Sequence, residues 1–258
     1  MTGNNRRGLI LQQRDRKLLE EISKMRIIDR ELAKVVAGFG STTRANARLL
    51  RLTRAGLLRS FFFGTIAGGR KAMYTLSTKG QQLVGSASGG IRRSPRQTVV
   101  GDLFIEHQMK VNEIYAITKF RKLPDGICVR QFRTFRAALA PGSAIIPDGY
   151  CEVEVFGQVR AMFVEVDLGT EALRIWQKKT SEYLRLAVSG QFTSIFSQPQ
   201  FRVLVITTSE RRLENIRATV VRFTDKIFWF STFLSINRDG FWSPIWLRPT
   251  GDQKVSLL

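Results

Sequence analysis

The segment STTRANARLLRLTRAGLL, residues 41–58, constrains the fold of this chain more than any other stretch. Read as a helix at about 100° per residue, it gathers four arginines on one side within an arc of roughly 120°. These arginines are Arg44, Arg48, Arg51 and Arg54. An apolar stripe of Ala45, Leu49 and Leu52 lies beside them. The pattern favours the second helix of a helix-turn-helix, which lies in a DNA groove, although a solvated basic face on an ordinary helix is the alternative.

The neighbouring segments extend this interpretation. They predict two earlier helices, at residues 13–25 and 30–39, and two later strands, at residues 59–63 and 73–76. Three helices followed by a β-hairpin is the order of a winged helix-turn-helix domain. In such a domain Arg70 and Lys71, near the hairpin tip, would contact phosphates or the minor groove. A plain hairpin loop is the alternative.

The charge of the chain is +20 and is unevenly distributed. Residues 1–97 hold 20 basic and 5 acidic side chains, whereas residues 98–258 hold 21 and 16. Such an excess favours nucleic acid as the partner, with an anionic membrane as the second choice. No apolar run approaches the roughly 20 residues that span a bilayer. The sequence therefore predicts double-stranded DNA as a partner and no membrane.

The chain has two cysteines, Cys128 and Cys151, too few for a disulfide framework or a four-thiolate zinc site. Both lie in predicted strands, where we expect them to be buried and reduced. The N-terminal residues lack the apolar core of a secretory signal. We therefore expect a cytoplasmic protein.

The predicted organisation has two domains. Residues 1–84 form the winged-helix DNA-binding domain, residues 85–97 a small, polar and basic linker, and residues 98–258 a second domain. The pattern of this second domain is a long helix, three strands, a helix and a further strand. It predicts an α/β fold with a mixed sheet.

Carboxylates follow one another on neighbouring strands of the second domain. Asp148 begins one predicted strand, and Glu165 and Asp167 lie near the end of the next. If Asp148 and Glu165 converge, their oxygens could bind Mg²⁺, which could activate water against a phosphodiester. Lys179, on the following helix, would stabilise the charge that builds on the phosphate.

This arrangement resembles the PD-(D/E)XK restriction-endonuclease core. Asp148 matches the aspartate of that motif and Glu165 its second acid, but Asp167 stands where the motif has lysine. A carboxylate there repels the phosphate that a lysine would attract. Lys179 is the better candidate to replace the missing lysine, because it borders the helix face formed by Leu173, Trp176, Thr180 and Tyr183. Lys178 points roughly the opposite way.

The order of several segments resembles the replication-relaxation family of bacterial, often plasmid-borne, proteins. The matching segments are RDRKLLEEI, TRANARLLRLTRAGLL, YTLSTKG, HQMKVNEIY, IIPDGY, FVEVDLGTE, KTSEY and FRVLVIT. The resemblance implies an N-terminal winged helix, a C-terminal restriction-endonuclease-like domain, and a role in plasmid replication and DNA relaxation. Glu-Val-Asp in place of the lysine-bearing motif is usual in that family.

We therefore expect a DNA-binding protein that acts in plasmid replication or its control, with a second domain that contacts DNA, forms a homodimer, or both. A Mg²⁺-dependent nuclease or nicking enzyme using Asp148, Glu165 and Lys179 is the first alternative. A winged-helix transcriptional regulator is the second. For the acidic site, a scaffold without catalysis is slightly favoured over an active centre. Trp229, Trp242 and Trp246 are expected in core packing or at a subunit interface.

Overall fold

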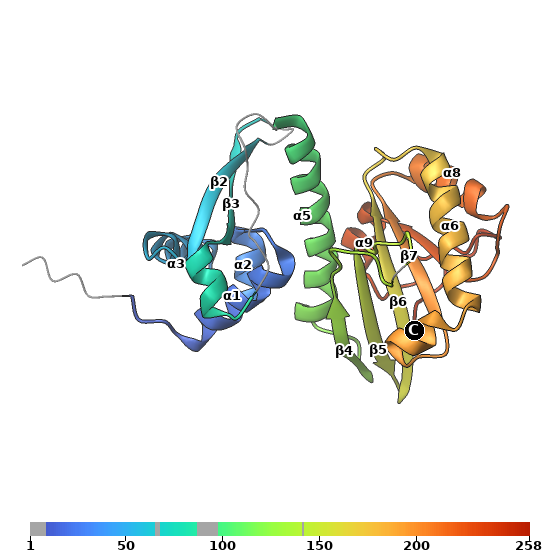
Figure 1. Ribbon diagram of the computed structural model, residues 1–258, viewed down its shortest axis with the longest axis horizontal. Coiled ribbons are helices and arrows are strands. Elements are labelled where there is room, and N and C mark those ends of the chain that lie inside the picture. The colour runs from blue at the N-terminus through green and yellow to red at the C-terminus, as the bar shows by residue number, and fades with distance from the viewer. Residues whose placement is uncertain (1–8, 65–67, 87–97, 141) are drawn as a thin grey trace, which may run out of the picture. The chain divides into compact units, whose positions relative to one another are not determined.

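The computed structural model describes residues 9–64, 68–86, 98–140 and 142–258 (Figure 1). Contacts divide the chain into two compact units, one up to Ala116 and one from Ile117 onward. The first contains a three-stranded sheet and the second a five-stranded mixed sheet, so the protein is of the mixed α/β class.

The first unit contains the helices and hairpin that the sequence predicts. Its elements are α1 (Gln13–Met25), β1 (Ile28–Asp29), α2 (Arg30–Ala37), α3 (Thr42–Arg54), β2 (Leu58–Gly64), β3 (Arg70–Leu76) and α4 (Thr78–Leu83). The strand order is β1-β3-β2, and both pairings are antiparallel. The short strand β1 was not predicted, since two residues are too few to show an alternation.

Side-chain caps explain where the helices of the first unit begin. The Asp29 carboxylate accepts the Leu32 N–H at 2.8 Å at the start of α2. The Ser41 hydroxyl accepts the Arg44 N–H at 3.2 Å at the start of α3. Each cap satisfies a backbone donor that the helix itself leaves unpaired. The starts of both helices are thereby set by these two side chains.

One glycine in this unit lies directly against the backbone of another segment. A Cβ atom at Gly80 of α4 would lie 2.2 Å from the carbonyl oxygen of Leu57, which precedes β2. The same carbonyl accepts the N–H of Ser77 at 3.0 Å. Position 80 therefore has room for hydrogen only.

The long helix α5 (Thr98–Phe120) belongs mostly to the first unit. The Asn112 amide donates to the carbonyls of Met25 at 3.0 Å and Ile27 at 2.7 Å, and the Tyr115 hydroxyl donates to Glu21. The sequence places a domain boundary after residue 97, whereas the contacts divide the chain within α5. Most of the predicted linker, residues 87–97, lies outside the described residues.

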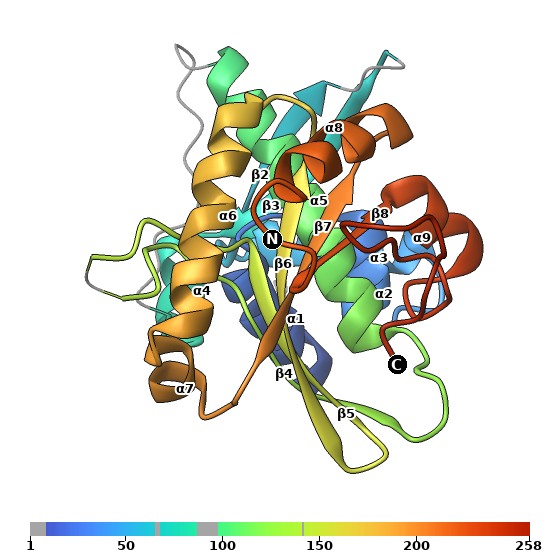
Figure 2. The same ribbon diagram turned by 90° about the vertical axis from the view of Figure 1, so that its right-hand side faces the viewer.

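The second unit is built on the order β4-β5-β6-β7-β8 (Figure 2). Its elements are β4 (Ile127–Arg133), β5 (Gly149–Val155), β6 (Gln158–Asp167), α6 (Leu173–Val188), α7 (Gln191–Phe196), β7 (Phe201–Thr207), α8 (Glu210–Val220), β8 (Phe228–Thr232) and α9 (Phe233–Asp239). Strands β4, β5 and β6 form an antiparallel meander, and β7 and β8 continue parallel to β6. The mixed sheet is therefore as predicted.

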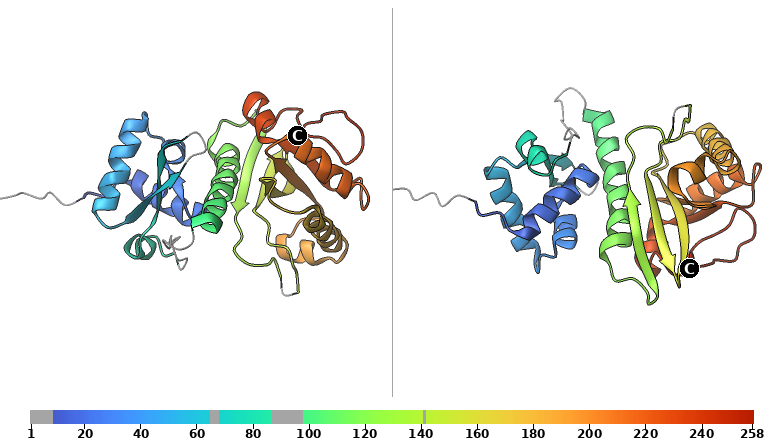
Figure 3. Two further views of the ribbon diagram at one scale, coloured as in Figure 1. Left: turned by 90° about the horizontal axis from the view of Figure 1, so that it is seen from above. Right: turned by 60° about the horizontal axis from the view of Figure 1, so that its bottom comes forward.

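Helices α6 and α8 lie along one face of this sheet (Figure 1 and Figure 3). Between helices and sheet is a core that contains Phe163, Trp176, Tyr183, Ile216 and Phe228. The two cysteines differ. Cys151 on β5 is buried, but Cys128 is exposed, contrary to our expectation. It lies on β4, at the edge of the sheet, where one row of side chains faces solvent.

Candidate functional site

Three of the four α3 arginines face solvent. Arg44, Arg51 and Arg54 are exposed, and none of their side chains makes an ion pair or hydrogen bond with any residue that the structure describes. The apolar stripe on the same helix is buried in the unit: Ala45, Leu49 and Leu52 have no exposed surface. The helix thus presents three guanidinium groups outward from a rigid, packed base.

Arg48 behaves differently from these three. Its Nε donates to Asp15 Oδ1 at 2.7 Å, and its guanidinium also contacts the second oxygen of Asp15 and the Ile10 carbonyl at 2.8 Å. Asp15 is fully buried and also accepts the Gln12 N–H at the start of α1. Burial disfavours the Asp15 carboxylate, but Arg48 and the Gln12 N–H lower its pKa below the ordinary value. Arg48 therefore ties α3 to α1.

The two basic residues of the hairpin also differ. Arg70 is exposed and makes no side-chain ion pair within the described part of the chain. Lys71 pairs with the buried carboxylate of Asp29, the residue that caps α2. Residues 65–67, at the tip, lie outside the described residues. Lys71 thus holds the hairpin against α2, whereas Arg70 extends into solvent.

The structure brings together three of the acidic-site residues that the sequence singles out. Asp148 immediately precedes β5 and its Oδ2 accepts the Val166 N–H at 2.7 Å. Glu165 is buried on β6, and Lys179 of α6 lies 3.0 Å from its Oε2. The Tyr183 hydroxyl donates to the other oxygen of Glu165. Lys179, predicted from helical geometry to aim at this site, does so.

Charge and burial oppose each other at Glu165. Burial raises the pKa of Glu165 and Asp148 adds to the effect, while Lys179 and the Tyr183 hydroxyl favour the carboxylate. Burial disfavours the Lys179 ammonium, but Glu165, Glu171 and Asp148 raise its pKa above the ordinary value. Lys179 also lies 3.0 Å from Glu171. The ammonium is therefore held among three carboxylates.

Asp167, at the usual lysine position, has its own partners. Arg212 of α8 donates to both of its oxygens, at 2.7 and 2.8 Å, Trp176 donates at 2.8 Å, and the Gly169 N–H at 2.7 Å. Burial would raise the pKa of Asp167, but these donors, with Arg212 first among them, lower it overall. Sequence reasoning missed Arg212. Because β7 runs parallel to β6, the first turn of the helix after β7 meets the end of β6, which could have indicated it.

The carboxylate oxygens at this site do not fit a bound Mg²⁺ ion. Within the described ranges, no three Asp, Glu, His or Cys side chains form a group suited to a metal. Both oxygens of Glu165 and of Asp167 already accept from protein donors, and one oxygen of Asp148 does so too. A divalent cation could bind Glu165 only after Lys179 had left it.

A family model described as Replication-relaxation matches residues 19–196. No curated protein and no solved structure matches the chain. In the part of the chain that the structure describes, no helix is long and apolar enough to cross a membrane.

Proposed function

Because the chain belongs to the replication-relaxation family, we propose that it binds double-stranded DNA in plasmid replication, DNA relaxation or their control. The observation that carries this proposal is the exposure of Arg44, Arg51 and Arg54 along one helix, without acidic partners in the described residues. A helix with exposed guanidinium groups along one side suits the major groove of DNA, where arginine side chains can hydrogen-bond to guanine.

The order of elements supports a winged helix-turn-helix reading of the first unit. Helices α2 and α3 follow one another with a short turn, and the β2–β3 hairpin comes directly after α3. In that reading α3 enters the major groove and the hairpin is the wing, with Arg70 on the DNA backbone. Arg48 and Lys71 support the domain from within.

The test uses the full chain and labelled duplexes from the plasmid origin and from the region upstream of its own gene. Anisotropy should show that Arg51→Ala weakens binding by roughly 1–3 kcal/mol if the residue reads a base. Arg174→Ala, which removes an exposed arginine from α6, is the matched control. Equal affinities for the parent and an Arg44/Arg51/Arg54 triple alanine variant would contradict the proposal.

Footprinting separates the two DNA-binding roles. Protection of the origin supports a replication protein, whereas protection confined to the upstream region supports the transcriptional regulator. For the second unit we propose additional DNA contact, homodimerisation or both, and sedimentation with and without duplex measures the association.

A nuclease is the second candidate function, because one specific observation favours it. The contact of Lys179 with Glu165, beside Asp148, matches the residue types of the PD-(D/E)XK core, and so does the order helix, three strands, helix, strand. The bidentate pair of Asp167 with Arg212 argues for a scaffold instead, since it neutralises the position that lysine would occupy. We therefore favour a nuclease-like domain without cleavage.

Incubation of supercoiled plasmid with Mg²⁺ or Mn²⁺ tests this preference. We expect no nicking above background. Nicking by the parent that disappears in Asp148→Asn would make the protein a nuclease.

A further inference from the structure

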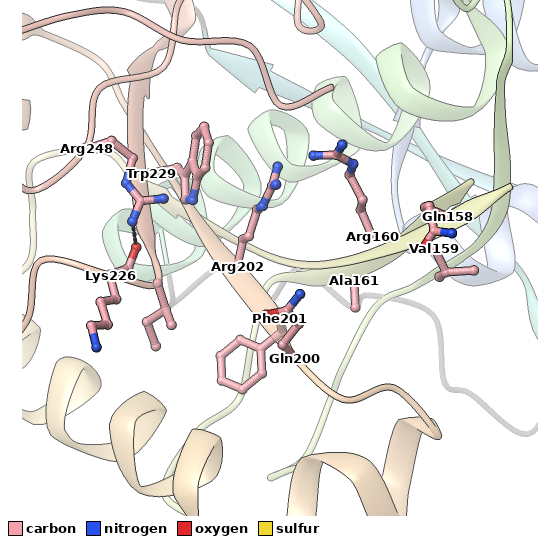
Figure 4. A pocket seen from close by; sticks show the side chains of 11 residues that line it. Gln158, Val159, Arg160, Ala161, Gln200, Phe201, Arg202, Lys226, Trp229 and Arg248 are labelled. Atoms are coloured by element: carbon pink, nitrogen blue, oxygen red, sulfur yellow. Dashed lines mark hydrogen bonds between the residues drawn. The ribbon is translucent and has the colours of Figure 1, made fainter. Parts of the chain in front are cut away.

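A basic pocket lies in the second unit, away from the acidic site. Its volume is about 500 Å³, and four cationic side chains line it: Arg160, Arg202, Lys226 and Arg248. Gln158, Gln200 and Trp229 add polar groups to the lining, and no carboxylate side chain does. Figure 4 shows these side chains around the starts of β6, β7 and β8.

The strand register places three of the pocket's side chains on the opposite face of the sheet from the acidic site. Arg202 pairs with Met162 and Trp229 with Leu204, so both side chains project from the same face as Arg160. Glu165 projects from the other face. Arg160 is near the start of β6 and Asp167 at its end, which separates them by roughly 20 Å along the strand.

The arginines are held in place without a carboxylate. Arg160 and Arg202 both donate to the Leu257 carbonyl, at 3.2 and 2.6 Å, and Arg248 donates to the Asp225 carbonyl at 3.2 Å. Within the described ranges none of the three forms an ion pair within 4 Å, although the charge of Asp225 acts on Arg248. Their positive charge is therefore largely uncompensated.

The indole ring of Trp229 contacts two of these arginines. The Arg202 guanidinium lies 4.5 Å and the Arg248 guanidinium 4.6 Å from the indole ring centre, so the ring lies between them (Figure 4). The indole is 8% exposed, yet its Nε1–H has no hydrogen-bond partner in the described structure. A buried donor without a partner is costly, and a ligand acceptor would satisfy it.

Burial, together with the like charges of Arg160 and Arg248, lowers the pKa of Arg202 to about 10. A bound anion would reduce this repulsion between the positive charges. Four cationic side chains suit an anion that carries several negative charges. The pocket volume falls in the range of small-molecule sites.

We propose that this pocket binds an oligophosphate group, either free or as the phosphate chain of a nucleoside triphosphate. The arginines provide forked donors that match phosphate oxygens, and Lys226 provides a mobile point charge. Both faces of the Trp229 ring are covered by arginine, so its contribution is the N–H and not stacking on a base.

The experiment titrates the full chain with sodium tripolyphosphate, ATP and adenosine at about 150 mM salt, by calorimetry and tryptophan emission. We expect tripolyphosphate and ATP to bind one per chain, and adenosine not to bind. Arg202→Gln and Arg248→Gln should each weaken binding by about tenfold or more. Arg174→Gln removes the same charge outside the lining residues and should leave the affinity unchanged.

Several results would overturn the proposal. They are no binding of either oligophosphate, equal weakening by Arg174→Gln, and binding of ATP without binding of tripolyphosphate. Equal affinity for the two would assign the site to the phosphate chain alone, and tighter binding of ATP would add a contact to the nucleoside. Should Arg202→Gln lose its near-ultraviolet circular dichroism, Arg160→Gln and Arg248→Gln carry the test. Duplex binding by α3 is measured separately, so either proposal can fail alone.

Discussion

Arg48 of α3 binds Asp15 of α1, with Nε 2.7 Å from Oδ1, although it belongs to the arginine face that the sequence assigns to DNA. Its side chain is only 11% exposed and that of Asp15 is fully buried. The ion pair therefore belongs to the interior of the first unit, while Arg44, Arg51 and Arg54 face outward.

Arg48→Ala should lower the free energy of unfolding by about 3 kcal/mol, because the Asp15 carboxylate would be left buried without its cation. Arg51→Ala should change it by less than about 0.5 kcal/mol, as for other exposed positions. Urea unfolding of the two variants measures both. If Arg48→Ala keeps full stability and loses DNA affinity as Arg51→Ala does, Arg48 reads DNA.

DNA binding should be mostly ionic. Residues 1–97 carry 20 basic and 5 acidic side chains, and each neutralised phosphate releases counterions. We expect affinity to fall more than about tenfold between about 50 and 200 mM salt. Arg70→Ala should lower the slope of log affinity against log salt by about one unit. A slope near zero for the parent would show that the basic unit is not the contact surface.

The pair of Asp167 and Arg212 should make stability depend on pH at the acid end. The folded pKa of Asp167 is depressed, so its stabilisation is complete above the unfolded pKa of about 3.9 and is lost as pH falls through the folded value. Asp167→Asn should lower stability by roughly 3 kcal/mol at pH 7. The deficit should shrink below about pH 4, as denaturant titrations at several pH values can measure. A constant deficit down to pH 2 would contradict the assignment.

Calorimetry with Mg²⁺ or Mn²⁺ should show no binding at the acidic site. Lys179 already compensates Glu165, and the oxygens of Asp167 are taken by Arg212, Trp176 and Gly169. Heats that are present in the parent and absent in Glu165→Gln would establish a metal site there. Asp125→Asn, at an exposed carboxylate after α5, controls for weak surface binding.

The helices and the hairpin of the first unit could be predicted because their signals are local. Ser41 and Asp29 are caps at the positions where α3 and α2 begin, and the burial of Leu49 and Leu52 follows the 3.6-residue period. The mixed sheet followed from apolar runs separated by helical ones. Lys179 was found in the same way, from its position on the helix face that turns toward the sheet.

The partners of the charged residues could not be predicted, because they depend on contacts distant in sequence. Asp15 lies 33 residues before Arg48, and Arg212 lies 45 residues after Asp167. A helical wheel places Arg48 at the end of the arginine arc, beside Leu52, but it does not show that the acidic partner comes from α1. The basic pocket could not be predicted from the sequence for the same reason, because its arginines come from β6, β7 and the segment after α9.

The contact of Gly80 with the Leu57 carbonyl bears on how this protein could be controlled in a living cell. Gly80→Ala would force the backbone of α4 away from the residue before β2, and so loosen the hairpin next to α3. The effect of the substitution would grow with temperature, because the first unit would have a smaller free energy of unfolding and would therefore unfold at a lower temperature. The second unit has its own core, so the same allele would leave it folded. Position 80 thus offers a heat-sensitive form in which the first unit, with the DNA binding that we propose for it, is lost while the second unit stays folded.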